Sequence, residues 1–252
     1  MPLSSFLRCK EEKQMTISSP PTEYYLKRKN KYLKDFKRIF KADHPVLLTH
    51  FSSQQIPTLL AETRKEFEDL LPQLPYLGGE KPFTDFIIFT AMILAFYRAS
   101  LTHGKSLEQF AIILFQVEKH YLQSTPKFLM RFFGPRTFHP NYINKVRQRA
   151  VETQQRQYPG NYVFEFVEGD GINFDYGIDY IECGACKYLD SQGASELAPY
   201  VCPADILYSR ILGWGLSRTQ TIAEGAERCD FRFKQGGPTD IAFPEILQEE
   251  VS

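Results

Sequence analysis

The chain has 252 residues, a length that allows one large domain or two fused subdomains with a sizeable hydrophobic core. Its composition, 43% hydrophobic, 24% charged and 14% aromatic, is typical of a globular protein, and 30 Lys and Arg residues balance 30 Asp and Glu residues. This zero net charge argues against a dedicated nucleic-acid-binding protein, which carries a strongly basic surface.

The charges are distributed unevenly along the chain. Residues 1–50 carry a net charge of +6 and residues 51–160 carry +4, whereas residues 161–252 carry −10. Because opposite charges attract, we interpret the acidic C-terminal third and the basic remainder as two parts that attract each other within one fold. A surface for polyanions is the alternative interpretation.

The N-terminal segment, residues 1–21, is polar and ends in Ser-Ser-Pro-Pro, so we predict a disordered leader. It contains no continuous apolar stretch of the kind found in signal peptides, which predicts a cytoplasmic protein. Apolar residues at helical spacing then predict a basic amphipathic helix over residues 23–42. Its lysines and arginines form either a solvated face or a contact with anionic lipid or nucleic acid.

Four further helices are predicted before residue 158, from hydrophobic periodicity and from Pro, Gly and capping signals. The most apolar of them contains the run 83–97, which at 15 residues is shorter than the ~20 needed to span a bilayer. We therefore predict a buried helix there and no transmembrane segment. The four helices are predicted over 57–71, over 84–101, from Ser106 to about residue 125, and over 140–157.

After Gly160 the pattern changes from helical to β periodicity. Aromatic and β-branched residues alternate with polar ones, and Gly-containing turns separate the segments. The strands are predicted over 162–167, 174–181, 219–223 and 229–233, and a helix bent at Pro203 over 196–212.

These elements predict an α+β fold, in which a helical N-terminal two-thirds packs on a small C-terminal antiparallel sheet with its own helix. We expect the strand ends and the bend at Pro203 to bring the cysteines of the C-terminal part near one another. The predicted organisation is a disordered leader at 1–21, a helical subdomain at 22–158, a cysteine-containing α+β subdomain at 159–235 and a tail at 236–252.

Four of the five cysteines lie in one 47-residue stretch, which is the main candidate for chemistry. Thiolates are nucleophiles and soft metal ligands, whereas a buried free cysteine often acts only as a small hydrophobic residue. Without an export signal, these thiols are expected in a reducing compartment, where disulfides are disfavoured. The four are Cys183, Cys186, Cys202 and Cys229, and Glu196, Asp205, Arg218 and Asp230 lie among them.

Two groups of residues resemble a known family. The first comprises residues 74–79, Leu-Pro-Tyr-Leu-Gly-Gly, the apolar helix that follows, and His103-Gly104-Lys105-Ser106. The second and closer group comprises Cys186 with Tyr188, Glu196 with Leu197, Cys202 with Asp205, and Gly225 with Cys229, Asp230 and Phe231. Over about residues 23–234 the chain resembles the L-2-amino-thiazoline-4-carboxylic acid hydrolase family. Cys183 is not part of this pattern.

The resemblance implies a hydrolase that opens a small cyclic amidine, such as an aminothiazoline carboxylate, at a C–N or C–S bond. Such a reaction requires attack on the amidine carbon, protonation of the leaving nitrogen or sulfur, and a group that holds the substrate carboxylate. The candidates are a thiolate of Cys186 or Cys202 as nucleophile, Asp205 or Glu196 as acid or base, and Arg218, Cys229 and Asp230 as substrate-binding groups.

Two other functions are alternatives. The C-terminal pattern also resembles the 4-vinyl-reductase-type domain, which implies a small-molecule-binding or sensor protein without catalysis. In the other alternative, Cys186, Cys202 and Cys229 hold a metal ion or an iron–sulfur cluster in an enzyme of another reaction class. The cysteine spacing lacks the second Cys-x-x-Cys of a zinc ribbon. Acidic neighbours raise the pKa of a free thiol, whereas a bound cation would reverse that effect. The sequence is compatible with a homo-oligomer.

Overall fold

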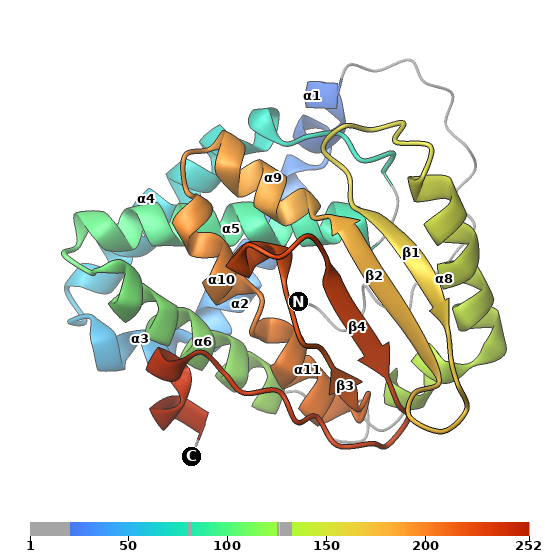
Figure 1. Cartoon of the computed structure of the whole chain (residues 1–252). Helices are drawn as coiled ribbons and strands as arrows, with labels where there is room; N and C mark the ends of the chain where they lie inside the picture. Colours follow the sequence, from blue (N-terminus) through green and yellow to red (C-terminus); the bar gives the residue numbers. More distant parts are fainter. Residues whose placement is uncertain (1–20, 80–81, 125, 127–132, 252) are drawn as a thin grey trace. The chain divides into compact units, whose positions relative to one another are not determined.

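The computed structural model describes residues 21–79, 82–124, 126 and 133–251, and it confirms the α+β fold. Of the described residues, 61% are helical, and they include a four-stranded antiparallel sheet in the C-terminal part (Figure 1). The predicted leader lies, except for its last residue, outside the described residues. The chain divides into two compact units, Met1–Leu107 and Glu108–Ser252.

The first unit is helical. The predicted basic helix over 23–42 is divided into two, because the backbone of Arg28 is not helical. The Arg28 guanidinium lies 3.9 Å from the centre of the Tyr24 ring. The Tyr25 hydroxyl donates a hydrogen bond of 2.7 Å to the Pro75 carbonyl, which fixes the first helix on a distant loop. The elements are α1 (Pro21–Leu26), α2 (Lys29–Ala42), α3 (His44–His50), α4 (Gln55–Leu70), η2 (Leu71–Gln73) and α5 (Phe83–Thr102).

The central helix of the first unit is α5, which packs along α4. Its buried residues occupy all sides of the helix, as in a core helix. At 20 residues, α5 is longer than the apolar run suggested, and by length and composition alone it could cross a membrane. However, 67% of its most apolar window is buried inside the protein. Burial, rather than length, therefore identifies it as a core helix.

The second unit contains the sheet, in the order β1-β2-β4-β3, with every neighbouring pair antiparallel. The strands are β1 (Val163–Glu168), β2 (Tyr176–Glu182), β3 (Leu216–Ser217) and β4 (Cys229–Phe233). The helices are α6 (Leu107–Gln123), α8 (Pro140–Thr153), α9 (Gly184–Ser191), α10 (Ala198–Val201) and α11 (Ala204–Leu212). Short 3-10 helices are η3 (Gly134–Phe138), η4 (Ser195–Leu197), η5 (Ile222–Glu224), η6 (Glu245–Leu247) and η7 (Glu249–Val251).

The two faces of the sheet differ in chemistry. In the β2–β4 register, Tyr180 lies opposite Cys229 and Ile178 opposite Phe231, while Asp179 lies opposite Asp230. Because alternate residues of a strand point to opposite faces, each face collects one of these sets. The aromatic face carries Phe164, Phe166, Tyr176, Ile178, Tyr180, Cys229, Phe231 and Phe233, and the polar face carries Asp179, Asp230 and Arg232.

One predicted strand was wrong, and the helices α3 and α9 and the short strand β3 were not predicted. Residues 219–223 form a loop that ends in η5, because the Asp230 carboxylate accepts the backbone N–H groups of Thr219 and Gln220 at 2.9 and 3.0 Å. In a strand, these two N–H groups would donate hydrogen bonds to carbonyl groups of a neighbouring strand. Helix α9 begins directly after Cys183, where the sequence analysis expected only the end of a strand.

Candidate functional site

The four cysteines of the C-terminal stretch, here called the thiol cluster, converge within the second unit. Cys183 follows β2, Cys186 lies in the first turn of α9, Cys202 lies between α10 and α11, and Cys229 begins β4. All four are free thiols, and each influences the pKa of at least one other through charge or a hydrogen bond. These interactions place the four thiols in one region of the second unit.

An ion pair lies beside the thiol cluster. Arg218 Nη1 is 3.2 Å from Asp205 Oδ2, and the Arg218 guanidinium lies 5.1 Å from the centre of the Phe231 ring. The Arg218 side chain is 7% exposed, whereas the Asp205 side chain is 42% exposed. Protein atoms nevertheless surround the Asp205 carboxyl closely enough that burial raises its pKa, against the opposing effect of Arg218. Asp205 is therefore both accessible to a ligand and more basic than a solvated carboxylate.

Three thiols of the cluster have raised pKa values. A hydrogen bond with Cys183 and then burial raise the pKa of Cys186, and burial followed by the charge of Asp205 raises that of Cys202. Burial raises the pKa of Cys229 to about 11, and its sulfur accepts the Ile222 N–H at 3.2 Å. These thiols therefore keep their protons at neutral pH, as the acidic neighbours in the sequence suggested.

Cys183 behaves in the opposite way, although the sequence analysis assigned it no role. A hydrogen bond from Cys186 lowers the pKa of Cys183 against its burial, with help from the backbone N–H groups of Ala185 and Cys186. Among the described residues, the Cys183 side chain makes no capping hydrogen bond at the start of α9. The two N–H groups therefore lower the pKa of Cys183 mainly because they lie near its sulfur. The signal in the sequence was the Cys-x-x-Cys spacing, whose first thiol is often acidified when a helix begins there.

Glu118, on α6, is a second residue that the sequence analysis missed. Burial, with a smaller contribution from the charge of Asp205, raises its pKa to about 8. The Glu118 carboxyl is therefore mostly protonated at neutral pH and lies near enough to Asp205 for the two charges to interact. Glu118 belongs to no recognisable motif in the sequence of α6.

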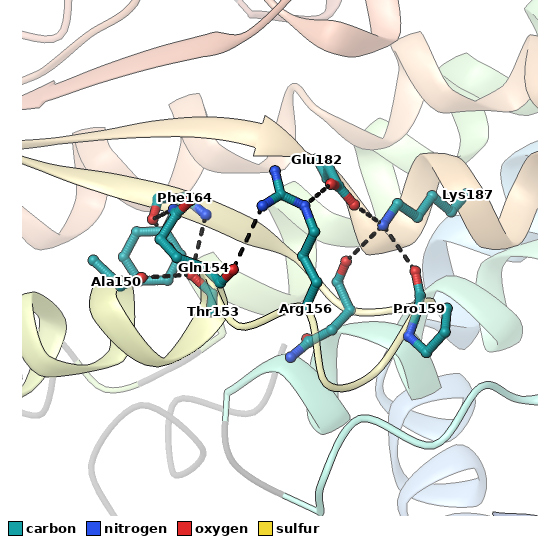
Figure 2. Close-up of polar contacts among 9 residues, drawn as sticks. Ala150, Thr153, Gln154, Arg156, Pro159, Phe164, Glu182 and Lys187 are labelled. Carbon is teal, nitrogen blue, oxygen red and sulfur yellow. Dashed lines mark hydrogen bonds and ion pairs between the residues drawn. The ribbon is translucent and has the colours of Figure 1, made fainter.

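The polar contacts at the junction between β2 and α9 fix the position of the first two thiols (Figure 2). Lys187 Nζ donates hydrogen bonds to the Pro159 carbonyl at 2.8 Å and to the Asn161 carbonyl at 3.1 Å, and it also pairs with Glu182. Arg156 Nε donates to the same Glu182 carboxylate at 2.8 Å. Glu182 and Lys187 flank the segment that contains both thiols, so this segment is tied at each end.

Two predicted site residues lie elsewhere. Glu196 is exposed on η4, and Asp230 lies on the polar face. Burial raises the pKa of Asp230, but hydrogen bonds from Thr219 and Gln220 outweigh it and lower the pKa overall. A hollow of about 650 Å³ on this face is lined by Asp230 among others, on the opposite side of the sheet from Cys229. The roles proposed for Glu196 and Asp230 stay predictions.

A shared metal site finds no support. Across the part of the chain that the structure describes, no group of three or more His, Cys, Asp or Glu side chains is arranged to hold a metal ion. Cys186, Cys202 and Cys229 therefore influence one another's pKa values without forming the ligand set that a metal ion or an iron–sulfur cluster requires.

Comparison with known proteins supports the resemblance found in the sequence. Residues 85–233, more than half of the chain, match the family model described as L-2-amino-thiazoline-4-carboxylic acid hydrolase. Neither the comparison with curated proteins nor that with solved structures gave a match. The matched stretch contains the whole thiol cluster, Glu118, Asp205 and Arg218.

Proposed function

Because the chain belongs to the L-2-amino-thiazoline-4-carboxylic acid hydrolase family, we propose that it hydrolyses a small cyclic amidine at a C–N or C–S bond. The reference substrate is 2-aminothiazoline-4-carboxylate, after which the family is named. The observation that carries the proposal is the accessible Asp205 carboxyl, made more basic by burial, which is paired with Arg218 beside the thiol cluster.

In the proposed reaction, water attacks the amidine carbon of the ring and Asp205 takes the proton that the water loses. The resulting tetrahedral carbon bears a hydroxyl, the ring sulfur and two nitrogens. It collapses with loss of the ring sulfur or the ring nitrogen, so the product is the substrate plus one water molecule. The raised pKa of Asp205 favours this role, because a general base is most effective when its pKa is near the working pH.

The leaving sulfur or nitrogen needs a proton. Glu118 and Cys202 both hold one at neutral pH, because burial raises the pKa of each. Direct attack by a thiol is the alternative route. The raised pKa values of Cys186 and Cys202 disfavour it, since a thiolate rather than a thiol is the nucleophile.

Arg218 is proposed to hold the substrate carboxylate while it orients Asp205. A guanidinium has five N–H donors, and the contact with Asp205 uses one of its nitrogens. The remaining donors can bind a second carboxylate through the planar fork that arginine provides. The Phe231 ring against the guanidinium keeps this fork in a defined orientation.

The test is a product assay with the purified full-length protein in reducing buffer. Mass spectrometry should detect a ring-opened product heavier by one water, and a thiol reagent separates the two outcomes, because C–S cleavage releases a thiol and C–N cleavage does not. Asp205→Asn should lower kcat/KM by about 100-fold or more. Asp240→Asn, at an exposed position, is the matched control and should retain activity.

The contrary result distinguishes the alternative functions. Tight binding of the thiazoline or of another small apolar ligand, without any product, would replace the hydrolase by a small-molecule-binding protein. Full activity in a correctly folded Asp205→Asn variant would remove Asp205 from the mechanism.

A further inference from the structure

Cys183 and Cys186 lie three residues apart at the start of α9. Cys183 is the residue before the helix, and its carbonyl accepts the Lys187 N–H at 3.0 Å as the first helical hydrogen bond. Residues three apart at the start of a helix face the same side, and each of these two thiols has the largest effect on the pKa of the other. Both are half-buried rather than enclosed. They are therefore a close and accessible pair.

The two thiols have unequal surroundings. The Cys186 thiol and then the backbone N–H groups of Ala185 and Cys186, at the positive end of α9, lower the pKa of Cys183. Asp205 opposes this effect by its negative charge, but the pKa of Cys183 is lowered overall, while that of Cys186 is raised. Cys183 is thus the thiol that can attack as a thiolate, whereas Cys186 keeps its proton, as in a reactive Cys-x-x-Cys pair.

The backbone around the pair leaves little room for movement. A Cβ added at Gly184 would lie 2.8 Å from Tyr162 Cε2 and 2.9 Å from the Gly160 carbonyl oxygen, so the first turn of α9 packs directly on the preceding loop. Lys187 ties the other end of this turn to the Pro159 carbonyl and to Glu182 (Figure 2). The two sulfur atoms are therefore held near each other in the folded protein.

We propose that Cys183 and Cys186 form a thiol–disulfide exchange site for low-molecular-weight disulfides such as oxidised glutathione. The Cys183 thiolate bonds to one sulfur of the disulfide, whose S–S bond breaks, and the other half leaves as a thiolate that takes a proton. Cys186 then loses its proton to solvent, bonds to the Cys183 sulfur and expels the second thiol. The pair is oxidised by two electrons to a disulfide, and the oxidised glutathione is reduced to two molecules of glutathione.

The other two thiols do not share these features. Cys229 is buried and its sulfur accepts the Ile222 N–H, and Cys202 has a raised pKa from burial and from Asp205. The reaction should therefore be confined to the Cys183–Cys186 pair. It requires no cyclic amidine, so its test is independent of the proposed hydrolase activity.

The test is incubation of the folded full-length protein with oxidised glutathione, followed by alkylation and tryptic mass spectrometry. One tryptic fragment, residues 157–187, contains both Cys183 and Cys186, whereas Cys202 and Cys229 fall in other fragments. We expect this fragment to become lighter by two hydrogen atoms and to resist alkylation until a reductant is added. In the reduced protein, Cys183 should react with iodoacetamide at neutral pH at least about ten-fold faster than Cys202 or Cys229.

Three variants complete the test. Cys186→Ser should trap a mixed disulfide with glutathione on Cys183, because the second thiol is missing, and Cys183→Ser should react slowly. The matched control, Cys202→Ser, should form the internal disulfide as the wild type does. A wild-type fragment 157–187 that stays reduced, or a Cys183 linked to Cys202 or Cys229 instead, would overturn the proposal. The wild-type result decides this even where a variant does not fold.

Discussion

The two faces of the sheet hold acidic residues in contrasting environments. On the polar face, Asp179 pairs with Arg232 and Arg228 at 2.5 and 3.4 Å, and Asp230 accepts three hydrogen bonds from Thr219 and Gln220. Beside the aromatic face, the opposing charge of Arg218 does not prevent burial from raising the pKa of Asp205.

The contrast separates carboxylates that hold the fold together from those available for chemistry. A carboxylate whose lone pairs are satisfied by fixed donors stabilises the structure and is a poor base. A partly desolvated carboxyl has a raised pKa, which is closer to the neutral pH at which a general acid or base works. By this criterion Asp205 and Glu118 are functional candidates, whereas Asp179 and Asp230 anchor strands and loops.

The largest effect expected from this comparison concerns Glu118 and pH. Because its folded pKa is raised to about 8, the folded protein favours the neutral form, so the stability present at low pH is lost as the pH rises toward that value. Between about pH 5 and about pH 8 the wild type should lose about 3 kcal/mol of unfolding free energy that Glu118→Gln does not lose. Urea unfolding across this range measures the difference.

Glu165→Gln, at an exposed position of β1, is the matched control for Glu118 and should follow the wild-type pH dependence. If Glu118→Gln shows the same slope as the wild type, Glu118 is not a protonated, desolvated carboxyl, and its proposed role as a proton donor fails with it.

On the polar face, Asp179→Asn should lower the unfolding free energy by about 2 kcal/mol, because Arg232 loses its counter-charge in a largely buried position. Asp179 is 7% exposed, so water replaces the lost interaction with Arg232 only in part. Thermal or chemical unfolding measures this, and kcat of ring opening should stay unchanged. A stable but inactive Asp179→Asn protein would show that the polar face takes part in the chemistry.

The smallest effect is expected for Asp230→Asn. The amide oxygen can still accept one of the N–H groups of Thr219 and Gln220, so the loss should be about 1 kcal/mol of unfolding free energy. We expect KM for the thiazoline to change by less than about two-fold. A KM increase of about ten-fold would instead support the substrate-binding role predicted for Asp230 from the sequence.

The elements that the sequence predicted well are those decided by local pattern. The strand predicted over 229–233 has these bounds in the structure, because aromatic residues alternate with charged ones there. The prediction over 219–223 failed because a side chain on another strand, Asp230, takes the backbone donors of Thr219 and Gln220. The short helix α9 lacked a strong periodic signal over its eight residues.

The same division applies to the candidate site. Residue type and spacing identified Cys186, Cys202, Asp205 and Arg218, and the structure brings them together. The low pKa of Cys183 depends on where α9 begins, and the raised pKa of Glu118 depends on burial against residues remote in sequence. Neither could be read from spacing alone.

By itself, the sequence of this protein determined its family, its α+β class and the stretch that carries its thiols, because hydrophobic periodicity and residue spacing are local properties. Only the tertiary structure decided which carboxylates are desolvated, which thiol is acidified and on which face of the sheet each lies. Those properties arise from burial and from dipoles contributed by segments that are distant along the chain.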